Sequence, residues 1–166
     1  MINKPIVLTI FLLLLPSFAF TQTAAELDTL LETKTVTVQL MARFILGSAE
    51  LLPQGLYGDT AQTAAYEMAL SNGWTKKSAT DFATLKDTAF LIMNVFDFKG
   101  GLFYSIFQSP RYAYRELLYK RIIQGRSDPS MTVSGDRLLQ IIGRALTFSG
   151  ENELMELLIL GDGGIN

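Results

Sequence analysis

The side chains in this sequence that could carry acid–base chemistry are mainly carboxylates. The chain of 166 residues contains no histidine and no cysteine. This excludes zinc sites of the His/Cys type, cysteine nucleophiles and triads with a histidine base. Asp59, Glu67 and Glu116 are the eligible carboxylates, but nothing in their spacing selects a pair, and acidic residues on amphipathic helices usually face solvent. We therefore expect no catalytic residue, no cofactor and no metal site.

Three arginines surround one polar, turn-rich segment. Arg121, Arg126 and Arg137 flank or lie within residues 124–130, which read QGRSDPS. They could present a cationic surface to an anionic ligand, although arginines around a turn more often form a solvated face. All three are therefore candidate binding residues.

The elements that must position these residues follow an N-terminal segment typical of export. Lys4 precedes the apolar run IVLTIFLLLL, Pro16 breaks the run, and small residues occupy positions 17 and 19. This order predicts a secretory signal peptide over residues 1–19, with a retained membrane anchor as the alternative. The run is shorter than the ~20 apolar residues that a spanning helix needs. We expect an exported protein, in the periplasm or at the cell surface, with no transmembrane span in the mature chain.

The remaining 147 residues, 166 less 19, have the size of one domain. Without Lys4 the chain holds 13 basic and 16 acidic residues, a net charge of −3. That balance is too near neutral to predict a surface for nucleic acid or anionic lipid. Because no disulfide can form, packing alone must hold the fold. We expect one domain over residues 20–160 and a flexible tail over residues 161–166.

Apolar residues recur at three- and four-residue steps along this domain, and no run alternates with period two. The pattern predicts an all-α fold. Helices are expected to begin near Ala24, after a Thr37 cap, near Asp59 or Thr60, near Asp87, near Pro110 and at Ser134. Expected helix ends lie at Pro53, Gly73, Gly100 and Gly161.

Two segments of the chain share a pattern at a spacing of 48 residues. Ala65-Tyr66 recurs as Ala113-Tyr114, and each pair lies in an expected helix that is followed by a short connector and a second helix. Identities are few, so the alternative is that any helical chain aligns with itself this well. We predict repeats over residues 64–98 and 112–146, with a possible degraded copy over residues 24–52.

The clearest copy resembles the S-layer homology repeat. That family's pattern is a helix ending in Gly-Ile-Ile-x-Gly, a segment like Asp-Gly-x-Phe-x-Pro, and then Ile-Thr-Arg-Ala-Glu opening the next helix. Here residues 121–125 read RIIQG, residues 128–131 read DPSM and residues 133–137 read VSGDR. The resemblance implies a helical bundle of helix-loop-helix units.

The physical roles of the motif can be assigned to residues of this chain. Ile122 and Ile123 should be buried between two helices, and Gly125 should give the turn its backbone freedom. Ser134 should cap the second helix. Arg137 replaces the Glu that would complete the capping box, so half of the box is lost.

The resemblance also implies a three-pronged unit whose grooves hold anionic, often pyruvylated, cell-wall polysaccharide, contacted by the Arg of the third motif. In this sequence Gly135 stands at that Arg position in the clearest copy, and Asp87 stands at the corresponding place in the weaker copy. The family's sugar-contacting Arg is therefore missing from both copies.

Aromatic residues concentrate between Phe96 and Tyr114, a segment that we call the aromatic strip. Phe103, Tyr104 and Tyr112 of the strip, together with Trp74, are candidate binding residues. Such side chains can stack on sugar rings, dock a partner or rest on a membrane surface. The alternative is that the strip forms the centre where the repeats meet.

The sequence thus predicts an exported, non-enzymatic envelope protein built from degenerate S-layer-homology-like repeats, which binds a cell-wall polysaccharide or an envelope protein. The first alternative is a periplasmic helical adaptor that binds a protein through the aromatic strip and has no polysaccharide role. A third class, a carboxylate-dependent wall hydrolase, would lose glycan cleavage on Glu67→Gln or Glu116→Gln.

Overall fold

The computed structural model describes residues 17–162, with side chains for residues 24–154. Its helices are α2 (Ser17–Glu32), α3 (Val38–Ser48), α4 (Gly58–Ser71), α5 (Leu85–Val95), α6 (Leu102–Ile106), α7 (Pro110–Tyr119) and α8 (Gly135–Asp162). No strand forms between residues 17 and 162, where only two isolated β-bridges occur. The all-α prediction is confirmed.

The predicted signal peptide falls mostly outside the described residues. Residues 1–16 lie outside them, and residues 17–19 are the first residues of α2. None of the described helices is both long and apolar enough to cross a membrane.

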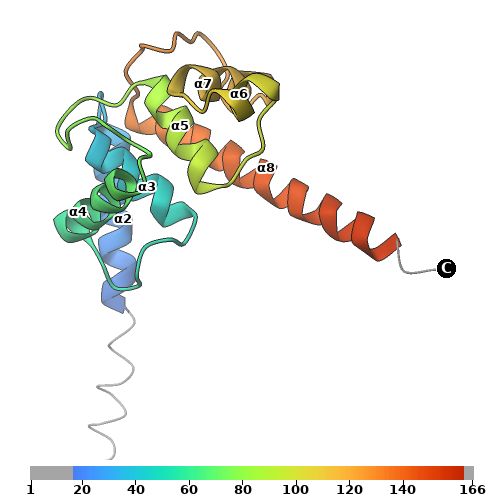
Figure 1. Ribbon diagram of the computed structural model, residues 1–166. Coiled ribbons are helices and arrows are strands. Elements are labelled where there is room, and N and C mark those ends of the chain that lie inside the picture. The colour runs from blue at the N-terminus through green and yellow to red at the C-terminus, as the bar shows by residue number, and fades with distance from the viewer. Residues whose placement is uncertain (1–16, 163–166) are drawn as a thin grey trace, which may run out of the picture.

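The helices pack in pairs around one core. α3 packs against α4, α5 packs against α7, and α2 packs against the first part of α8. Figure 1 shows α6 and α7 together at one end of the molecule, away from α4, and the second half of α8 projecting beyond the other helices. The core draws buried side chains from every helix pair, among them Leu30, Ile45, Leu91, Leu117 and Leu138.

Local capping explains where the helices begin. The Thr37 hydroxyl accepts a hydrogen bond from the Leu40 amide at 3.3 Å, and the Ser134 hydroxyl accepts one from the Arg137 amide at 3.3 Å. Pro110 occupies the first turn of α7, where its missing N–H costs nothing. These three predicted starts are confirmed.

Other predicted boundaries are wrong. α5 begins at Leu85 rather than near Asp87 and ends at Val95 rather than Gly100. α3 ends at Ser48, before the predicted stop at Pro53, because Glu50 turns the backbone to a φ of 56°. α8 continues through Gly161 to Asp162, so the first two residues of the predicted flexible tail are helical. Residues 163–166 lie outside the described residues.

Three extended segments meet at the centre of the fold and exchange backbone hydrogen bonds. The Val36 amide donates to the Val133 carbonyl at 2.8 Å, the Val133 amide donates to the Ala83 carbonyl at 3.2 Å, and the Ala83 amide donates to the Val36 carbonyl at 2.9 Å. All three residues are fully buried. These bonds close a cycle, which we call the central ring.

Each member of the central ring stands just before the residue that caps a helix. Val36 precedes Thr37 and α3, Ala83 precedes Thr84 and α5, and Val133 precedes Ser134 and α8. The backbone amide of the first residue of each of these helices also donates a hydrogen bond to a backbone carbonyl that lies two or three residues before a central-ring residue of another segment. The pairs are Val38 to Asp81 at 2.8 Å, Leu85 to Met131 at 2.9 Å and Gly135 to Thr33 at 2.9 Å. The starts of three helices are therefore held by one set of backbone contacts.

The ends of α4 and α7 have the same hydrogen-bond pattern. The Trp74 amide donates to the Ala69 carbonyl at 2.8 Å, and the Ile122 amide donates to the Leu117 carbonyl at 2.9 Å, 48 residues further on. The central-ring residues Ala83 and Val133 stand 50 residues apart. The connector after α7 is thus two residues longer than the connector after α4, so one ungapped spacing cannot align both helices of the two segments.

Candidate functional site

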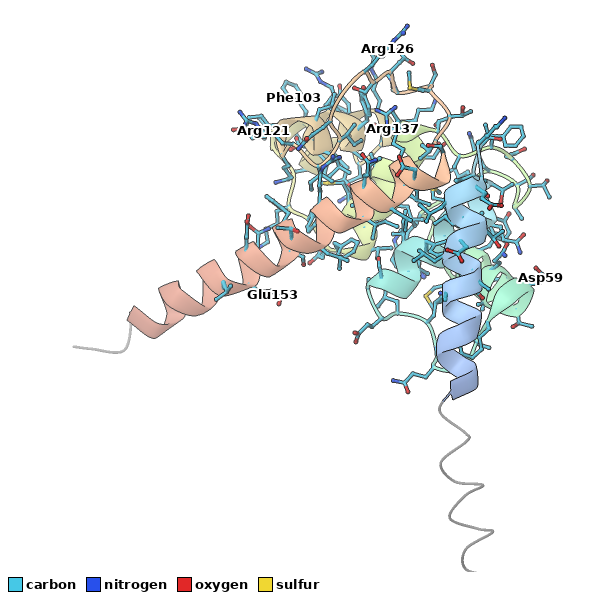
Figure 2. The ribbon with its side chains drawn as sticks, turned by 180° about the vertical axis from the view of Figure 1, so that it is seen from behind. Asp59, Phe103, Arg121, Arg126, Arg137 and Glu153 are labelled. Atoms are coloured by element: carbon cyan, nitrogen blue, oxygen red, sulfur yellow. The ribbon has the colours of Figure 1, made fainter. Side chains whose placement is uncertain are left out.

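The three candidate arginines do not form one cationic surface. The Arg137 guanidinium donates to the Arg126 carbonyl at 2.8 Å, to the Gln124 carbonyl at 3.4 Å and to the Met131 sulfur at 3.0 Å. Arg137 therefore holds the connector between α7 and α8. Arg121 and Arg126 are exposed, and Figure 2 shows their side chains directed outward at separate points.

The four motif residues take the structural positions expected of them. Ile122 and Ile123 are 1% and 2% exposed. Gly125 has a φ of 75°, a conformation that favours glycine. Ser134 caps α8. The connector is thus anchored at both ends, by buried isoleucines after α7 and by a capping hydroxyl before α8.

Arg121 takes a left-handed backbone conformation where the end of α4 uses a glycine. Its φ is 57°, and the φ of Gly73 at the corresponding position is 71°. We expect Arg121→Gly to stabilise the fold by about 1 kcal/mol, because a non-glycine residue is strained there. Gly73→Ala should destabilise it by a similar amount. Urea unfolding measures both, and a loss of stability in Arg121→Gly would mean that the arginine side chain makes a contact worth more than the strain.

Asp128 organises the turn in the middle of the connector. The Ser130 amide donates to the Asp128 carboxylate at 2.8 Å, and the Ser130 hydroxyl donates to the same oxygen. These two bonds to Ser130 lower the pKa of Asp128 below its ordinary value of 3.8. A carboxyl with a lowered pKa stabilises the folded turn above the usual titration range of aspartate, and this contribution is lost as the pH falls through the lowered pKa.

A pH titration checks this turn. We expect the amide chemical shift of Ser130 to follow Asp128 with a midpoint below 3.8. Ser130→Ala removes the hydroxyl donor and should raise the pKa of Asp128 toward its ordinary value. Equal midpoints in the two proteins would show that the hydroxyl bond does not stabilise the carboxylate.

Asp87 has a different role from the one expected at the Arg position of the repeat motif. Its carboxylate accepts hydrogen bonds from the amide and the hydroxyl of Thr84, which completes a capping box at the start of α5. It also pairs with Lys77 at 2.7 Å. Asp87 therefore has the capping role that the resemblance would give to the motif's Glu. The placement of Asp87 at the Arg position rested on a spacing of 48 residues, whereas the residues before these two helices, Ala83 and Val133, stand 50 apart.

A groove of about 460 Å³ lies between the end of α4, the side of α5 and the start of α7. We call it the Trp74 groove. Its walls come from residues 72–77, from Asp87, Phe90 and Asn94 on α5, and from Gln108, Ser109 and Pro110. The sequence points to Trp74 by its residue type alone, because the groove exists only once α5 and α7 are in place.

The Trp74 groove combines an aromatic face with polar and cationic groups. Trp74 is half-buried and Lys76 is exposed, and the amides of Asn72, Asn94 and Gln108 line the walls. Lys77 is neutralised by Asp87, whereas among the described residues Lys76 has no ion-pair partner. Such a set of groups can stack against a sugar ring, satisfy hydroxyls and attract an anion.

A second groove of about 450 Å³ has a related position, between α2, α3 and the start of α4. Here the Glu26 carboxylate pairs with Arg43 at 3.1 Å and accepts the amide of Gly58. The chain thus supplies its own anion to the cationic group and to the amide in this groove. The sequence does not predict these contacts, because Glu26 lies 17 positions from Arg43 and 32 from Gly58 and no motif connects them.

Two of the candidate carboxylates, Asp59 and Glu67, line one open pocket of about 360 Å³ along α4, and Glu116 is not part of it. Asp59 and Glu67 lie on α4, separated by a helical rise of ~12 Å, and Glu116 lies on α7. Paired carboxylates in glycosidases are ~5–9.5 Å apart. Figure 2 shows Asp59 on the opposite side of the molecule from Phe103. Within the described residues, no group of three or more acidic side chains could hold a metal ion.

The aromatic strip is divided between the core and the surface. Phe98, Tyr104 and Tyr114 are 6–7% exposed, and burial, followed by the charge of Glu116, raises the pKa of Tyr104. Phe103 and Phe107 are 63% and 55% exposed. Both stack on Tyr112, with ring centroids 6.1 and 6.0 Å away. Of the candidate binding residues in the strip, Tyr104 is therefore a core residue and Phe103 is a surface residue.

Comparison of the chain with protein-family models, with curated proteins and with solved structures finds no match in any of the three.

Proposed function

We propose that this chain is an exported, non-catalytic cell-envelope protein that binds an anionic cell-wall polysaccharide in the Trp74 groove. Its fold is assigned to three degenerate S-layer-homology-like units, α2–α3, α4–α5 and α7–α8. The observation that carries the proposal is the position of this groove, where one helix pair meets the next, together with its lining, which includes both an aromatic ring and an exposed cationic side chain.

The central ring supports the assignment of three units. Its members Val36, Ala83 and Val133 each stand one residue before a helix cap, and each donates to and accepts from another member. Three segments in equivalent positions of a repeated unit are expected to make such reciprocal contacts. The matching ends of α4 and α7 support the same assignment.

The chemistry of the two related grooves supports the choice of site. Glu26 neutralises Arg43 in the α2–α3 groove, so an anionic ligand there would compete with an internal carboxylate. In the Trp74 groove the internal carboxylate, Asp87, pairs with Lys77 and leaves Lys76 to attract a ligand. Among the two grooves, the Trp74 groove therefore suits an anionic polysaccharide better.

Substitution of Trp74 tests the proposal. We expect Trp74→Ala to weaken binding to polymer-bearing cell-wall sacculi about tenfold or more, because the residue supplies the stacking face. Lys76→Gln should weaken binding and reduce its dependence on salt. The matched control for Trp74 is Phe82→Ala, an aromatic side chain that is 56% exposed and lies outside the groove. Equal binding by Trp74→Ala and the wild type would contradict the assignment.

The adaptor alternative needs the aromatic strip as a protein interface. Phe103 and Phe107 are exposed, which favours a protein interface. Phe98, Tyr104 and Tyr114, however, are buried in the core. Only part of the strip is thus accessible to a partner. Polysaccharide binding in the Trp74 groove is therefore favoured over protein binding through the aromatic strip.

A further inference from the structure

We propose that α6 and the outer face of α7 bind the surface of an anionic lipid bilayer, with the apolar side chains of α6 inserted among the headgroups. This surface, which we call the α6–α7 face, is separate from the Trp74 groove. The proposal goes beyond polysaccharide binding because it gives the protein a second attachment, to the membrane.

The apolar part of the α6–α7 face is carried by a single short helix. Leu102, Phe103, Ile106 and Phe107 are 72%, 63%, 61% and 55% exposed. Large apolar side chains scattered singly over a surface are ordinary, but four within six residues form a patch that marks an interaction site. Gly100 and Gly101 precede the patch. Tyr104, on the other side of α6, is only 6% exposed and packs this helix against the core.

The outer face of α7 extends this patch with cationic and aromatic groups. Arg111, Arg115 and Tyr119 are all exposed and recur every four residues, so they lie along one side of the helix. Tyr119 is 86% exposed. Tyr112, which stacks on both Phe103 and Phe107, connects α6 to this side of α7.

Charge is strongly segregated toward this end of the molecule. Residues 98–127 contain six basic residues and one acidic residue, whereas the rest of the chain contains eight basic and fifteen acidic residues. The net charge of the whole chain therefore conceals a basic region and an acidic remainder. Lys120 is directed to the Phe148 ring at 4.8 Å. The exposed cations nearest the patch along the chain are Lys99, Arg111, Arg115 and Arg121. Figure 2 shows Phe103 and Arg121 directed outward at the same end of the molecule.

A bilayer surface fits this combination better than a polysaccharide does. Exposed leucine, isoleucine and phenylalanine side chains offer a sugar few hydrogen bonds, since Ser105 is the one exposed polar side chain of α6. The boundary of an anionic bilayer supplies both hydrocarbon for the apolar side chains and phosphate groups for the arginines. Neither attraction alone gives stable attachment, and the α6–α7 face offers both.

Vesicle binding tests the proposal. The protein is expressed from its full coding sequence, its soluble product is purified, and its intact mass records the N-terminus. Flotation is measured with vesicles of phosphatidylcholine containing one third phosphatidylglycerol and with vesicles of phosphatidylcholine alone.

We expect the double variants Phe103→Gln/Phe107→Gln and Arg111→Gln/Arg115→Gln each to bind anionic vesicles about tenfold more weakly than the wild type. The arginine variant should also lose the preference for anionic over neutral vesicles.

The controls change the same residue types elsewhere. Phe82→Gln removes an exposed aromatic ring, and Lys34→Gln removes an exposed cation, and both should bind vesicles like the wild type. Trp74→Ala should also bind vesicles normally, which separates this surface from the polysaccharide groove. Circular dichroism and urea unfolding verify that each variant is folded.

Two results would overturn the proposal. One is equal vesicle binding by the wild type and both double variants, since any attraction would then come from another part of the chain. The other is absence of vesicle binding together with self-association that Phe103→Gln/Phe107→Gln abolishes in sedimentation velocity. In that case the α6–α7 face binds a second copy of the chain rather than a membrane.

Discussion

Ile122→Asp is expected to unfold the protein or to lower its stability by about 3–5 kcal/mol. The side chain is 1% exposed and follows directly on the end of α7, where the residue's own amide donates to the Leu117 carbonyl. A carboxylate at this place would lose its hydration without gaining a partner. Single domains are stable by only ~5–15 kcal/mol, so a loss of this size removes much of the total. Urea unfolding followed by circular dichroism measures it.

Tyr119→Asp is the matched control for this substitution. Tyr119 is the last residue of α7, three positions before Ile122, and is 86% exposed. We expect its replacement by Asp to change stability by less than ~0.5 kcal/mol. An unchanged melting temperature for Ile122→Asp would contradict the buried position of the isoleucine pair and the assignment of residues 112–146 to one repeat.

Gly135→Ala is expected to destabilise the fold by about 3 kcal/mol although it adds only one methyl group. A Cβ atom at this position would lie 1.7 Å from the Leu30 carbonyl oxygen and 2.6 Å from the carbonyl carbon. Backbone cannot move aside as a flexible side chain can, so α8 would have to separate from the end of α2. That movement would also break the hydrogen bond from the Gly135 amide to the Thr33 carbonyl.

Gly143→Ala on the same helix provides the control. Gly143 is exposed within α8, and no atom lies within 4 Å of the position that its Cβ would take. We expect this substitution to raise stability by about 0.5–1 kcal/mol, because alanine favours a helix interior. Stabilisation of both alanine variants would show that the start of α8 and the end of α2 are not in close contact.

The contact at Gly135 also bears on the missing arginine of the repeat motif. The resemblance assigns this position to the family's sugar-contacting Arg, but α2 leaves no room here for any side chain. Restoring the motif by Gly135→Arg should therefore disrupt folding rather than create a binding site. Polysaccharide binding, as proposed for the Trp74 groove, does not depend on this position.

The features that could be predicted from the sequence are those set by neighbouring residues. Thr37, Ser134 and Pro110 act within one helical turn of their own positions, and the burial of Ile122 follows from a local apolar pattern. Asp87 was misplaced although its capping box with Thr84 is also local. The reason is that an ungapped spacing of 48 residues set the register, whereas the longer connector after α7 shifts the second helices to a spacing of 50.

The features that could not be predicted depend on contacts between distant segments. The Trp74 groove needs α5 and the start of α7 on either side of the tryptophan. Arg137 binds carbonyls of the connector rather than a ligand, and only the folded path of that connector brings them within reach. The basic region over residues 98–127 was hidden by the net charge of the whole chain. Its distribution along the sequence could have been counted, but its exposure beside α6 required the fold.

Binding to cell-wall sacculi tests the central proposal most directly. The purified protein is sedimented with sacculi before and after their attached polymers are stripped, and with excess free polymer as competitor. We expect binding to polymer-bearing sacculi, loss of binding on stripping, and competition by the free polymer. Absence of binding to either preparation, or binding that survives stripping, would contradict recognition of an anionic polysaccharide in the Trp74 groove.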